Sequence, residues 1–422
     1  MVLFIPWLSW PMLLAIIFLS WLVYMVWHFR HFSKLDIPVA GTPLPVLGTN
    51  LPMFKKGLLV SATEDIEKYG KTYGGFTGRL PYIITMEPDI IREVFIKRVH
   101  DFPNRFAFKS GGDPVHDNML GNINDYHRWK SIRGIISPTF SSGKLKRMMT
   151  QINKCAAIFA GHLTKSAECG KSVEMKEYAG SFSMDVIAST GFGLDVNTAE
   201  DRNNPFVVNA SKVFDELFSL GNKMVLANVF CPQLLPLLHF LGYRLVNQNI
   251  MDFFTDVTNQ TMDMRKDDKC GKVDFITLMM NAHNEDENKG SKALTRTEIL
   301  AQAILFFTAG YDTTASSISF LAYNLACHPE EQDKLIEEVK DVIGDKDDIT
   351  DEDLHKMPYL EMCMNESLRM YSIVLRLERY AARDVVVKGI PLPKGSMVGY
   401  PIYQIHHSPE IYPEPEKFKP ER

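Results

Sequence analysis

Residues 295–326 read TRTEILAQAILFFTAGYDTTASSISFLAYNLA, and this stretch does most to decide the fold. It opens with Thr295 and Glu298 in the spacing of a capping box, in which the hydroxyl and the carboxylate satisfy N–H groups at the start of a helix. The apolar turns that follow predict a buried helix over 295–326. Its middle, TAGYDTT at 308–314, is unusual because Gly, Asp and Thr are weak helix formers.

This central heptapeptide combines small residues with an acid and an alcohol. Ala309 and Gly310 predict a gap on one face of the helix, and Asp312 and Thr313 stand beside that gap. The combination suits a small ligand that is held over a groove while protons are relayed to it. A polar kink lined by water is the alternative that these residues alone leave open.

Around this helix, the 422-residue chain has the composition of a large globular protein. It carries 46 basic and 51 acidic residues, and 45% of its residues are hydrophobic. The net charge of −5 gives no support for nucleic-acid binding, which needs a basic face. Six cysteines without a Cys-x-x-Cys or Cys/His cluster indicate neither a disulfide framework nor a zinc site.

Most of the chain has helical periodicity, so we predict a mainly α fold with small β-sheets. Strand-like runs are short, notably Tyr82–Met86 and Asp384–Val387. The expected helices cover Ser61–Tyr69, Trp129–Ile136, Gly143–Cys169, Ser181–Gly191, Phe206–Phe218, Asn247–Arg265, Thr295–Ala326 and Pro329–Val342.

The first 29 residues carry no formal charge and are long enough to cross a bilayer as a helix. A cleaved signal peptide fits poorly, because no basic segment precedes the apolar run and no small-residue cleavage site follows it. Arg30 and Lys34 come directly after the run, so the positive-inside rule predicts a cytosolic body. The sequons at Asn209, Asn259 and Asn365 would then stay unmodified.

Three regions follow from these patterns: a membrane anchor (1–29), a basic and proline-rich hinge (30–50) and a body (51–422). Pro38, Pro43 and Pro45 predict an extended, stiff spacer within the hinge, although an irregular lead-in to the body remains the alternative. The segment Phe214–Leu245 is unusually apolar for a connector, so we expect it to be either buried or dipped into the bilayer.

Two further helical patterns carry chemistry. Glu366 and Arg369 share one helix face, either as a surface ion pair or, given their apolar neighbours, as a buried pair that needs further hydrogen bonds. Trp129 and Arg133 bring an indole N–H and a guanidinium together at i, i+4. They suit the binding of a carboxylate, with a cation–π contact in the core as the plain alternative.

In order along the chain come Tyr-x-Arg-Trp-x-x-x-Arg, Ala-Gly-x-Asp-Thr-Thr, Glu-x-x-Arg and Pro-Glu-Lys-Phe-x-Pro-Glu-Arg. With the anchor and hinge, these motifs resemble the cytochrome P-450 family from the N-terminus to the last residue. SPTFSSGKLKRM, AGYDTT, LRLERYAARDV and PEPEKFKPER are most similar to its microsomal drug- and steroid-oxidising branch. The resemblance implies the P-450 fold and the cofactor haem b (iron protoporphyrin IX).

The resemblance also implies roles for single residues. Asp312 and Thr313 would deliver protons during the activation of dioxygen. The haem propionates would be bound by Arg105, Trp129, Arg133 and Arg379. A buried structural network would comprise Glu366, Arg369 and Arg422. The substrate pocket would be lined by Leu305, Ala309, Val374 and Leu375, under a membrane-dipping roof formed by Phe214–Leu245.

By the same resemblance the protein would be a monooxygenase that inserts one oxygen atom from O₂ into a lipophilic small molecule of the xenobiotic, steroid or fatty-acid type. Its partners would be an NADPH-cytochrome reductase, cytochrome b5, the substrate and the membrane, with no nucleic acid. It would reside in the endoplasmic reticulum membrane as a single-pass protein with its body facing the cytosol. Apolar pocket walls do not name the substrate.

One departure from the family pattern concerns the haem-ligating loop, Phe-x-x-Gly-x-Arg-x-Cys-x-Gly. The family places it after the segment that ends here at Arg422, and none of the six cysteines lies in such a context. We therefore expect no metal ligand within these residues and no monooxygenase activity from them alone, because the thiolate is needed for O–O cleavage. A fragment of an active enzyme and an inactive truncated isoform at the membrane remain the two alternatives, and we expect Arg422 to be frayed.

Overall fold

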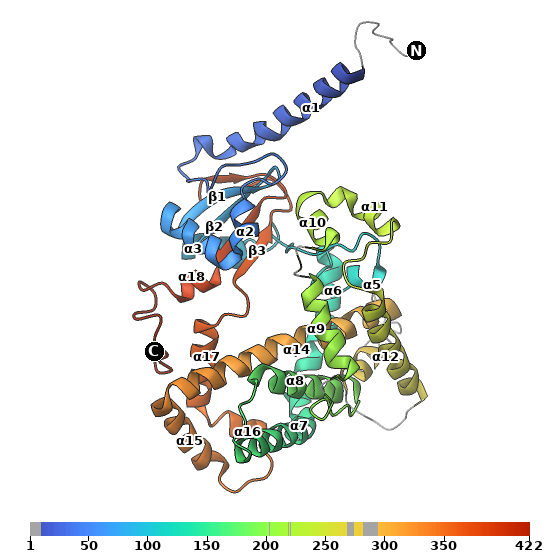
Figure 1. Ribbon diagram of the computed structural model, residues 1–422, viewed down its shortest axis with the longest axis vertical. Coiled ribbons are helices and arrows are strands. Elements are labelled where there is room, and N and C mark those ends of the chain that lie inside the picture. The colour runs from blue at the N-terminus through green and yellow to red at the C-terminus, as the bar shows by residue number, and fades with distance from the viewer. Residues whose placement is uncertain (1–9, 202, 218, 220, 268–273, 282–293) are drawn as a thin grey trace. The chain divides into compact units, whose positions relative to one another are not determined.

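The computed structural model describes residues 10–201, 203–217, 219, 221–267, 274–281 and 294–422. Contacts within the chain divide it into two compact units. Unit 1 comprises Met1–Phe106 and Val374–Ile411, and unit 2 comprises Ala107–Ile373 and Tyr412–Arg422. The predicted class, mainly helical with small sheets, is confirmed (Figure 1). The predicted boundaries at residues 29 and 50 stay predictions.

Unit 1 is built around a four-stranded sheet in the order β1-β2-β6-β3. β1 (Thr72–Thr77) and β2 (Leu80–Thr85) form a hairpin, β6 (Met397–Pro401) runs parallel to β2, and β3 (Arg376–Tyr380) pairs antiparallel with β6. A small second sheet joins β4 (Val385–Val387) to β5 (Ile390–Leu392). The helical elements of this unit are α1 (Trp10–Trp27), η1 (His28–Lys34), α2 (Leu51–Lys56), α3 (Leu58–Tyr69), α4 (Pro88–Arg92), η2 (Glu93–Lys97) and α18 (Ile402–His406).

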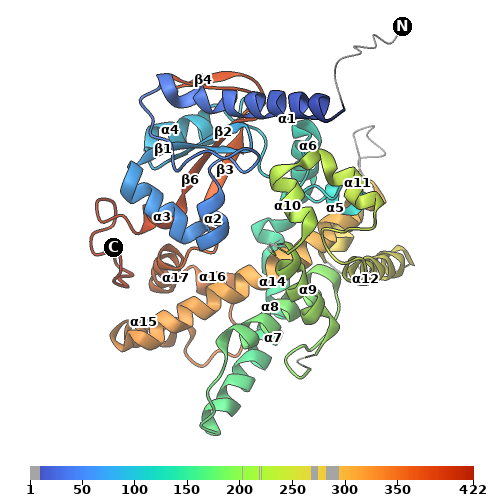
Figure 2. The same ribbon diagram turned by 45° about the horizontal axis from the view of Figure 1, so that its top comes forward.

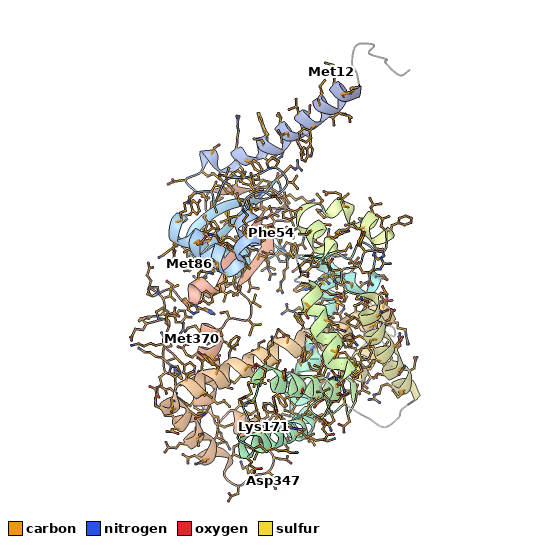
Figure 3. The ribbon with its side chains drawn as sticks, in the orientation of Figure 1. Met12, Phe54, Met86, Lys171, Asp347 and Met370 are labelled. Carbon is orange, nitrogen blue, oxygen red and sulfur yellow. The ribbon has the colours of Figure 1, made fainter. Side chains whose placement is uncertain are left out.

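Helix α1 is apolar on all sides and exposed along its length. A candidate membrane span covers Pro11–Ser33 with a mean hydropathy of 2.0; its apolar helical window is not buried within the protein, whereas Phe32, near its end, belongs to the core of unit 1. Figure 1 shows α1 extending away from the sheet of its own unit, and Figure 3 shows side chains standing out from it, with Met12 near its outer end. A helix that is hydrophobic all round needs an apolar environment, which a bilayer supplies. Residues 1–9 of the predicted anchor lie outside the described residues.

The proline-rich stretch is docked on the sheet of unit 1. The Ala40 N–H donates to the carbonyl of Gly74 at 2.9 Å, and the Thr49 N–H donates to the carbonyl of Phe76 at 2.8 Å. Gly48 has φ +62°, and a Cβ there would lie 1.9 Å from the Phe76 carbonyl oxygen. Residues 39–49 are therefore an irregular lead-in held against β1, which was the alternative to a free spacer.

Unit 2 is a helical body arranged around α14 (Arg296–Cys327), which matches the helix predicted from the opening stretch. Figure 2 shows α14 passing beside α8. The capping box between Thr295 and Glu298 is present as predicted. The other helical elements are α5 (Pro114–Asp117), α6 (Tyr126–Ile136), η3 (Ser137–Phe140), α7 (Ser142–Glu168), α8 (Met175–Phe192), α9 (Pro205–Leu217), α10 (Lys223–Phe230), η4 (Pro232–Leu234), α11 (Leu235–Phe240), α12 (Gln248–Asp267), α15 (Pro329–Ile343), α16 (Asp351–Leu354) and α17 (Pro358–Met370).

Helices α8 and α14 pack closely because small residues lie where they cross. A Cβ on Gly310 would lie 2.7 Å from Cδ1 of Ile187, and a Cβ on Gly180 would lie 3.2 Å from the ring of Tyr311. The Ser183 hydroxyl donates to the backbone carbonyl of Tyr311 at 3.0 Å. Ile187 therefore fills the space beside Gly310, whereas Ala309, the other residue of the predicted gap, is exposed, and a ligand space there stays a prediction.

The apolar segment Phe214–Leu245 is both buried and exposed. Met224 and Leu235 are fully buried, in a cluster of their own under α10 and α11. On the opposite side Leu237 is 53% exposed and Phe240 is 84% exposed, which leaves an apolar surface on α11. Phe218 and Leu220 lie outside the described residues.

Candidate functional site

The middle of α14 remains helical despite its weak helix formers. The Thr313 hydroxyl donates to the carbonyl of Ala309 at 2.7 Å, and the Thr308 hydroxyl donates to the carbonyl of Ile304 at 3.0 Å. Such bonds satisfy the hydroxyls locally and hold their side chains along the helix. The alternative of a kink that interrupts the helix is not what the structure has, since α14 runs unbroken from Arg296 to Cys327.

Asp312 is held by a cation from the neighbouring helix. Nζ of Lys176, at the start of α8, lies 3.0 Å from Oδ1 of Asp312. The carboxylate is 30% exposed and the ammonium group 55% exposed, so the pair is of the partly solvated kind that contributes little to stability. The carboxylate of Asp312 therefore contacts α8, whereas the hydroxyl of the adjacent Thr313 bonds to the backbone of α14 itself.

The phenol of Tyr311, the residue before this acid, is affected by its charge. Burial, together with the charges of Asp312 and Glu177, raises the pKa of the Tyr311 phenol above its ordinary value. The phenol therefore stays protonated next to the acid–alcohol pair across the physiological range.

Helix α6 carries the two candidate propionate ligands of unit 2. The guanidinium of Arg133 lies 5.2 Å from the ring centre of Trp129, so the cation–π contact proposed as the alternative is present. Arg133 is exposed, however, and the contact is not part of the core. Both side chains lie on one helix face, and the guanidinium remains accessible to a carboxylate.

An ion pair between helices fixes α6 against the first turn of α14. The guanidinium of Arg128 donates to the carboxylate of Glu298, which is 7% exposed. Burial opposes ionisation of Glu298, but Arg128 and the N–H and hydroxyl of Thr295 outweigh it and hold the pKa of the carboxyl below its ordinary value. The pair thereby sets the place of Trp129 and Arg133 relative to α14.

In unit 1, the structure brings Arg105 and Arg379 together. Tyr380 donates its N–H to the carbonyl of Asn104 at 2.9 Å, so the residue before Arg105 pairs with the residue after Arg379. Burial raises the pKa of Tyr400, and the positive charges of Arg379 and Arg105 act on the same phenol in the opposite direction. Two guanidinium groups thus converge beside Tyr400, a donor set suited to carboxylates.

The Glu366 carboxylate is the centre of a buried network in unit 2. Glu366 is 4% exposed and Arg369 is 5% exposed, so the burial expected for this pair is confirmed. Nε and one terminal nitrogen of Arg369 lie 2.8 and 2.9 Å from the two carboxylate oxygens, and the Lys419 N–H donates at 3.0 Å.

Arg422 completes this network. Its Nε donates to Glu366 at 2.9 Å, and its terminal nitrogens donate to the carbonyls of Pro413 at 2.8 Å and Lys417 at 2.9 Å. The expectation that Arg422 would be frayed is therefore wrong, because a buried carboxylate and backbone carbonyls hold its side chain.

The four predicted pocket residues are divided between the units. In unit 2, Leu305 packs against the main core cluster, and Ala309 is exposed on α14. In unit 1, Val374 is 48% exposed and Leu375 accepts the Ile402 N–H at 2.9 Å. Leu305 and Ala309 thus belong to unit 2, and Val374 and Leu375 belong to unit 1. The role of all four residues in a substrate pocket stays a prediction.

Within each unit the predicted residues offer donors that a haem carboxylate needs: two guanidinium groups in unit 1, and an indole N–H and a guanidinium in unit 2. That they bind the propionates stays a prediction. Among the described residues there is no cluster of three His, Cys, Asp or Glu side chains that would hold a metal ion. Burial raises the pKa of the Cys155 and Cys363 thiols to about 11, so both are protonated at neutral pH in the protein without a bound metal. Cys270 lies outside the described residues.

Several contacts at this site could not be found from the sequence. Arg128 lies inside the quoted Tyr-x-Arg-Trp motif and Glu298 inside the capping box, so a sequence motif contains each residue. No sequence pattern, however, indicates that the two form an ion pair. Lys176 carried no signal, because nothing in its surroundings on α8 indicates a partner on α14.

Comparison with known proteins gives matches over most of the chain. The family model described as "Cytochrome P450" matches residues 38–422. Cytochrome P450 3A29 of Sus scrofa is 38% identical over 405 residues, which cover 95% of this chain and 79% of that protein. Cytochrome P450 3A41 of Mus musculus is 40% identical over 394 residues (93% and 77%), and cytochrome P450 3A5 of Homo sapiens is 37% identical over 393 residues (93% and 77%).

Proposed function

The chain belongs to the cytochrome P450 family of haem-dependent monooxygenases, and on this premise we propose that it oxidises lipophilic small molecules of the xenobiotic, steroid or fatty-acid type. It is an oxidoreductase whose cofactor is haem b. The observation that supports the finer proposal is the acid–alcohol pair Asp312–Thr313 in the middle of α14, with Asp312 paired to Lys176 and Thr313 bonded to the Ala309 carbonyl.

Haem, when bound, supplies the reduction and cleavage of dioxygen, and this chain's residues hold the group and manage protons around it. Arg105 and Arg379 from unit 1 and Trp129 and Arg133 from unit 2 would bind the two propionates. The Arg128–Glu298 pair would keep α6 in place while Arg133 stays exposed to its carboxylate.

Proton delivery falls to Asp312 and Thr313. The Thr313 hydroxyl donates to Ala309 now, and rotation about its χ1 bond would free that proton for transfer. Asp312 would resupply it from solvent, because its carboxylate is partly exposed. General acid–base relays of this kind contribute about 10²–10⁴-fold to a rate.

Substrate recognition would rest on apolar contact. Leu305 and Ala309 of α14, with Val374 and Leu375, would line the pocket, and the exposed apolar side of α11 would meet the lipid from which lipophilic molecules come. Helix α1 would anchor the protein in the endoplasmic reticulum membrane with its body in the cytosol. Electrons would come from an NADPH-dependent reductase, with cytochrome b5 as a second partner.

The test is a carbon monoxide difference spectrum of the reduced protein, recorded together with NADPH-dependent product formation. The native protein in its membrane should give the red-shifted Soret band of a thiolate-ligated haem and should oxidise a lipophilic substrate. Native protein that binds haem but forms no product would contradict the proposal.

The alternative of a catalytically inactive form stays a prediction for residues 1–422 expressed alone. Those residues should give no thiolate-type band, since none of their six cysteines lies in the sequence context of the family's haem-ligating loop. A thiolate-type band with turnover from this expressed segment would show that one of its own cysteines ligates the iron.

A further inference from the structure

We propose that a pocket between α7 and α8, lined by aromatic rings and by the buried carboxylate of Asp185, binds a quaternary alkylammonium cation. This pocket is separate from the candidate site described above, because none of the described residues that line it belongs to the predicted haem or substrate contacts. Both helices belong to unit 2, and the proposal does not depend on the proposed function.

The pocket is formed where α7 lies beside α8 (Figure 1). Each helix contributes residues spaced by three or four positions, and this spacing places them on one helix face. They include Ile158 and Phe159 of α7 and Tyr178, Phe182 and Asp185 of α8. The face of α8 that packs against α14 carries other residues, so a ligand here would not displace α14.

Aromatic rings form one wall of the pocket. The ring centres of Phe159 and Phe182 lie 5.2 Å apart with an angle of 29° between the ring planes, so the two rings are stacked. The phenol of Tyr178 is held to the hydroxyl of Ser166 at 3.1 Å, which fixes the third ring. Aromatic faces attract cations, and groups of such rings recognise quaternary ammonium ligands in proteins.

The size of the interior suits a methylated ammonium group. The interior measures about 70 Å³. One water molecule needs about 10–15 Å³ of such space, so there is room for about five heavy atoms. A trimethylammonium group and the carbon that carries it have five heavy atoms, whereas the rest of a longer ligand would extend through the open mouth.

The carboxylate of Asp185 is fixed in the wall without a ligand. Asp185 is 7% exposed, and its Oδ1 accepts the Thr198 N–H at 2.8 Å. The hydroxyl of Thr198 donates in turn to the carbonyl of Ser181 at 3.0 Å, which ties the chain after α8 to that helix. Burial raises the pKa of Asp185 above its ordinary value, although the bonds from Thr198 act in the opposite direction.

No basic side chain among the described residues forms an ion pair with Asp185. Lys154 pairs with the exposed carboxylate of Asp195, and His162 lines the pocket without pairing with Asp185. Burial raises the pKa of the Cys155 thiol, and the charges of Asp185 and Asp195 raise it further. A buried carboxylate without a cation is costly, so a cationic ligand would supply the missing charge.

The remaining lining discriminates between classes of cation. A primary ammonium group needs three hydrogen-bond acceptors, whereas a quaternary one needs none and suits a wall of rings. Glu177 is exposed and also lines the pocket, so a second negative charge lies toward the solvent. It would repel a phosphate attached to the cation, as in a phosphatidylcholine headgroup. The lining therefore favours a free alkylammonium over a lipid headgroup.

The experiment measures dissociation constants by saturation-transfer NMR with the full, haem-loaded chain in dodecyl maltoside, which contains no choline group. Choline is the probe, and 3,3-dimethylbutan-1-ol is its neutral isostere. A quaternary nitrogen has no lone pair, so it cannot bind through the haem iron. Choline should bind at least about tenfold more tightly than the isostere, and at least about fivefold more tightly than phosphocholine.

Three variants locate the site. D185N keeps the size of the side chain and the acceptor for the Thr198 N–H, and it should weaken choline binding at least about tenfold. F159L should weaken it at least about threefold, because one aromatic face is lost. The matched control is D195N, since Asp195 is 72% exposed and is not among the residues that line the pocket. It should change choline binding less than about twofold.

Equal binding of choline and its isostere to the wild-type protein would overturn the proposal, as would unchanged choline binding in D185N. An equal effect of D185N and D195N would also overturn it, because it would indicate net charge and not contact. Should D185N fold poorly, unchanged choline binding in F159L would overturn the proposal by itself. Phosphocholine binding as tight as that of choline would overturn the assignment to a free alkylammonium and indicate a lipid headgroup.

Discussion

Replacing Glu366 by alanine should destabilise unit 2 more than almost any other single loss of an acid. The substitution removes the acceptor of Arg369, Arg422 and the Lys419 N–H together. Arg369, only 5% exposed, would then remain as a buried charge without its carboxylate, although it would keep the Pro415 carbonyl at 2.7 Å.

The size of this effect follows from what remains buried. Removing one partner of a buried ion pair costs about 3–5 kcal/mol. Each kcal/mol lowers the unfolding temperature by about 2–4 °C in a domain of about 150–250 residues, and unit 2 is at or above the upper limit of that range. Taking the lower value, E366A should lower the transition by about 6–10 °C.

Thermal unfolding in detergent, followed by circular dichroism, measures this shift. The matched control is E352A, which removes an exposed acid paired with Lys146 at 2.8 Å and should cost less than about 1 kcal/mol. The double variant E366L/R369M should lose less than the two single variants added together, because the buried charge of Arg369 is removed with its partner and only the more exposed Arg422 loses a carboxylate. An E366A transition within 2 °C or so of the E352A transition would refute the reasoning, since a buried charge cannot be left uncompensated at so small a cost.

Three other predictions use the same contacts. Because the pKa of Glu298 is depressed in the folded protein, its ion pair with Arg128 should stabilise the fold fully above about pH 4.5 and lose that contribution as the pH falls through the folded pKa. E298Q should flatten this part of the stability–pH curve measured by thermal unfolding, and an unchanged curve would contradict the assigned pair. G111A should cost about 1–3 kcal/mol in the same assay, because φ is +80° and a backbone oxygen occupies the Cβ position, whereas G121A, at an open position, should cost less than about 1 kcal/mol. The sequons at Asn209, Asn259 and Asn365 should stay unglycosylated if the body is cytosolic; Asn365 is exposed, so an endoglycosidase-sensitive shift of the wild-type chain on a gel would contradict the orientation.

The sequence predicted the helices well, because their signals are local. The helix predicted at 295–326 is observed at Arg296–Cys327, with its capping box. The strands carried weaker signals: β1 reads TYGGFT with two glycines, β3 reads RLERY with alternating charge, and β6 reads MVGYP. These segments form strands because they hydrogen-bond to distant parts of the chain, and their local sequence pattern does not indicate those partners.

In the candidate site, too, contacts within one helix could be predicted from the sequence, whereas contacts between distant elements could not. Glu366 and Arg369 share one helix, so their pairing followed from spacing, and their burial followed from apolar neighbours. The Lys176–Asp312 and Arg128–Glu298 pairs join elements far apart in the sequence, and no local pattern indicates these pairings. The contact of Ile187 with Gly310 likewise joins two helices, so the sequence alone did not show that α8 fills the space beside Gly310.

The central claim is that Asp312 and Thr313 manage protons for oxygen activation. It is tested most directly by the ratio of product formed to NADPH consumed in the native protein and its T313A variant, both with haem and reductase in lipid nanodiscs. Thr313 is not among the predicted haem ligands, so the haem spectrum should be unchanged. The ratio should fall at least about tenfold, with peroxide released in place of product, since a proton relay is worth about 10²–10⁴-fold. An unchanged ratio, with the haem spectrum also unchanged, would show that Thr313 only satisfies the Ala309 carbonyl and would contradict the claim.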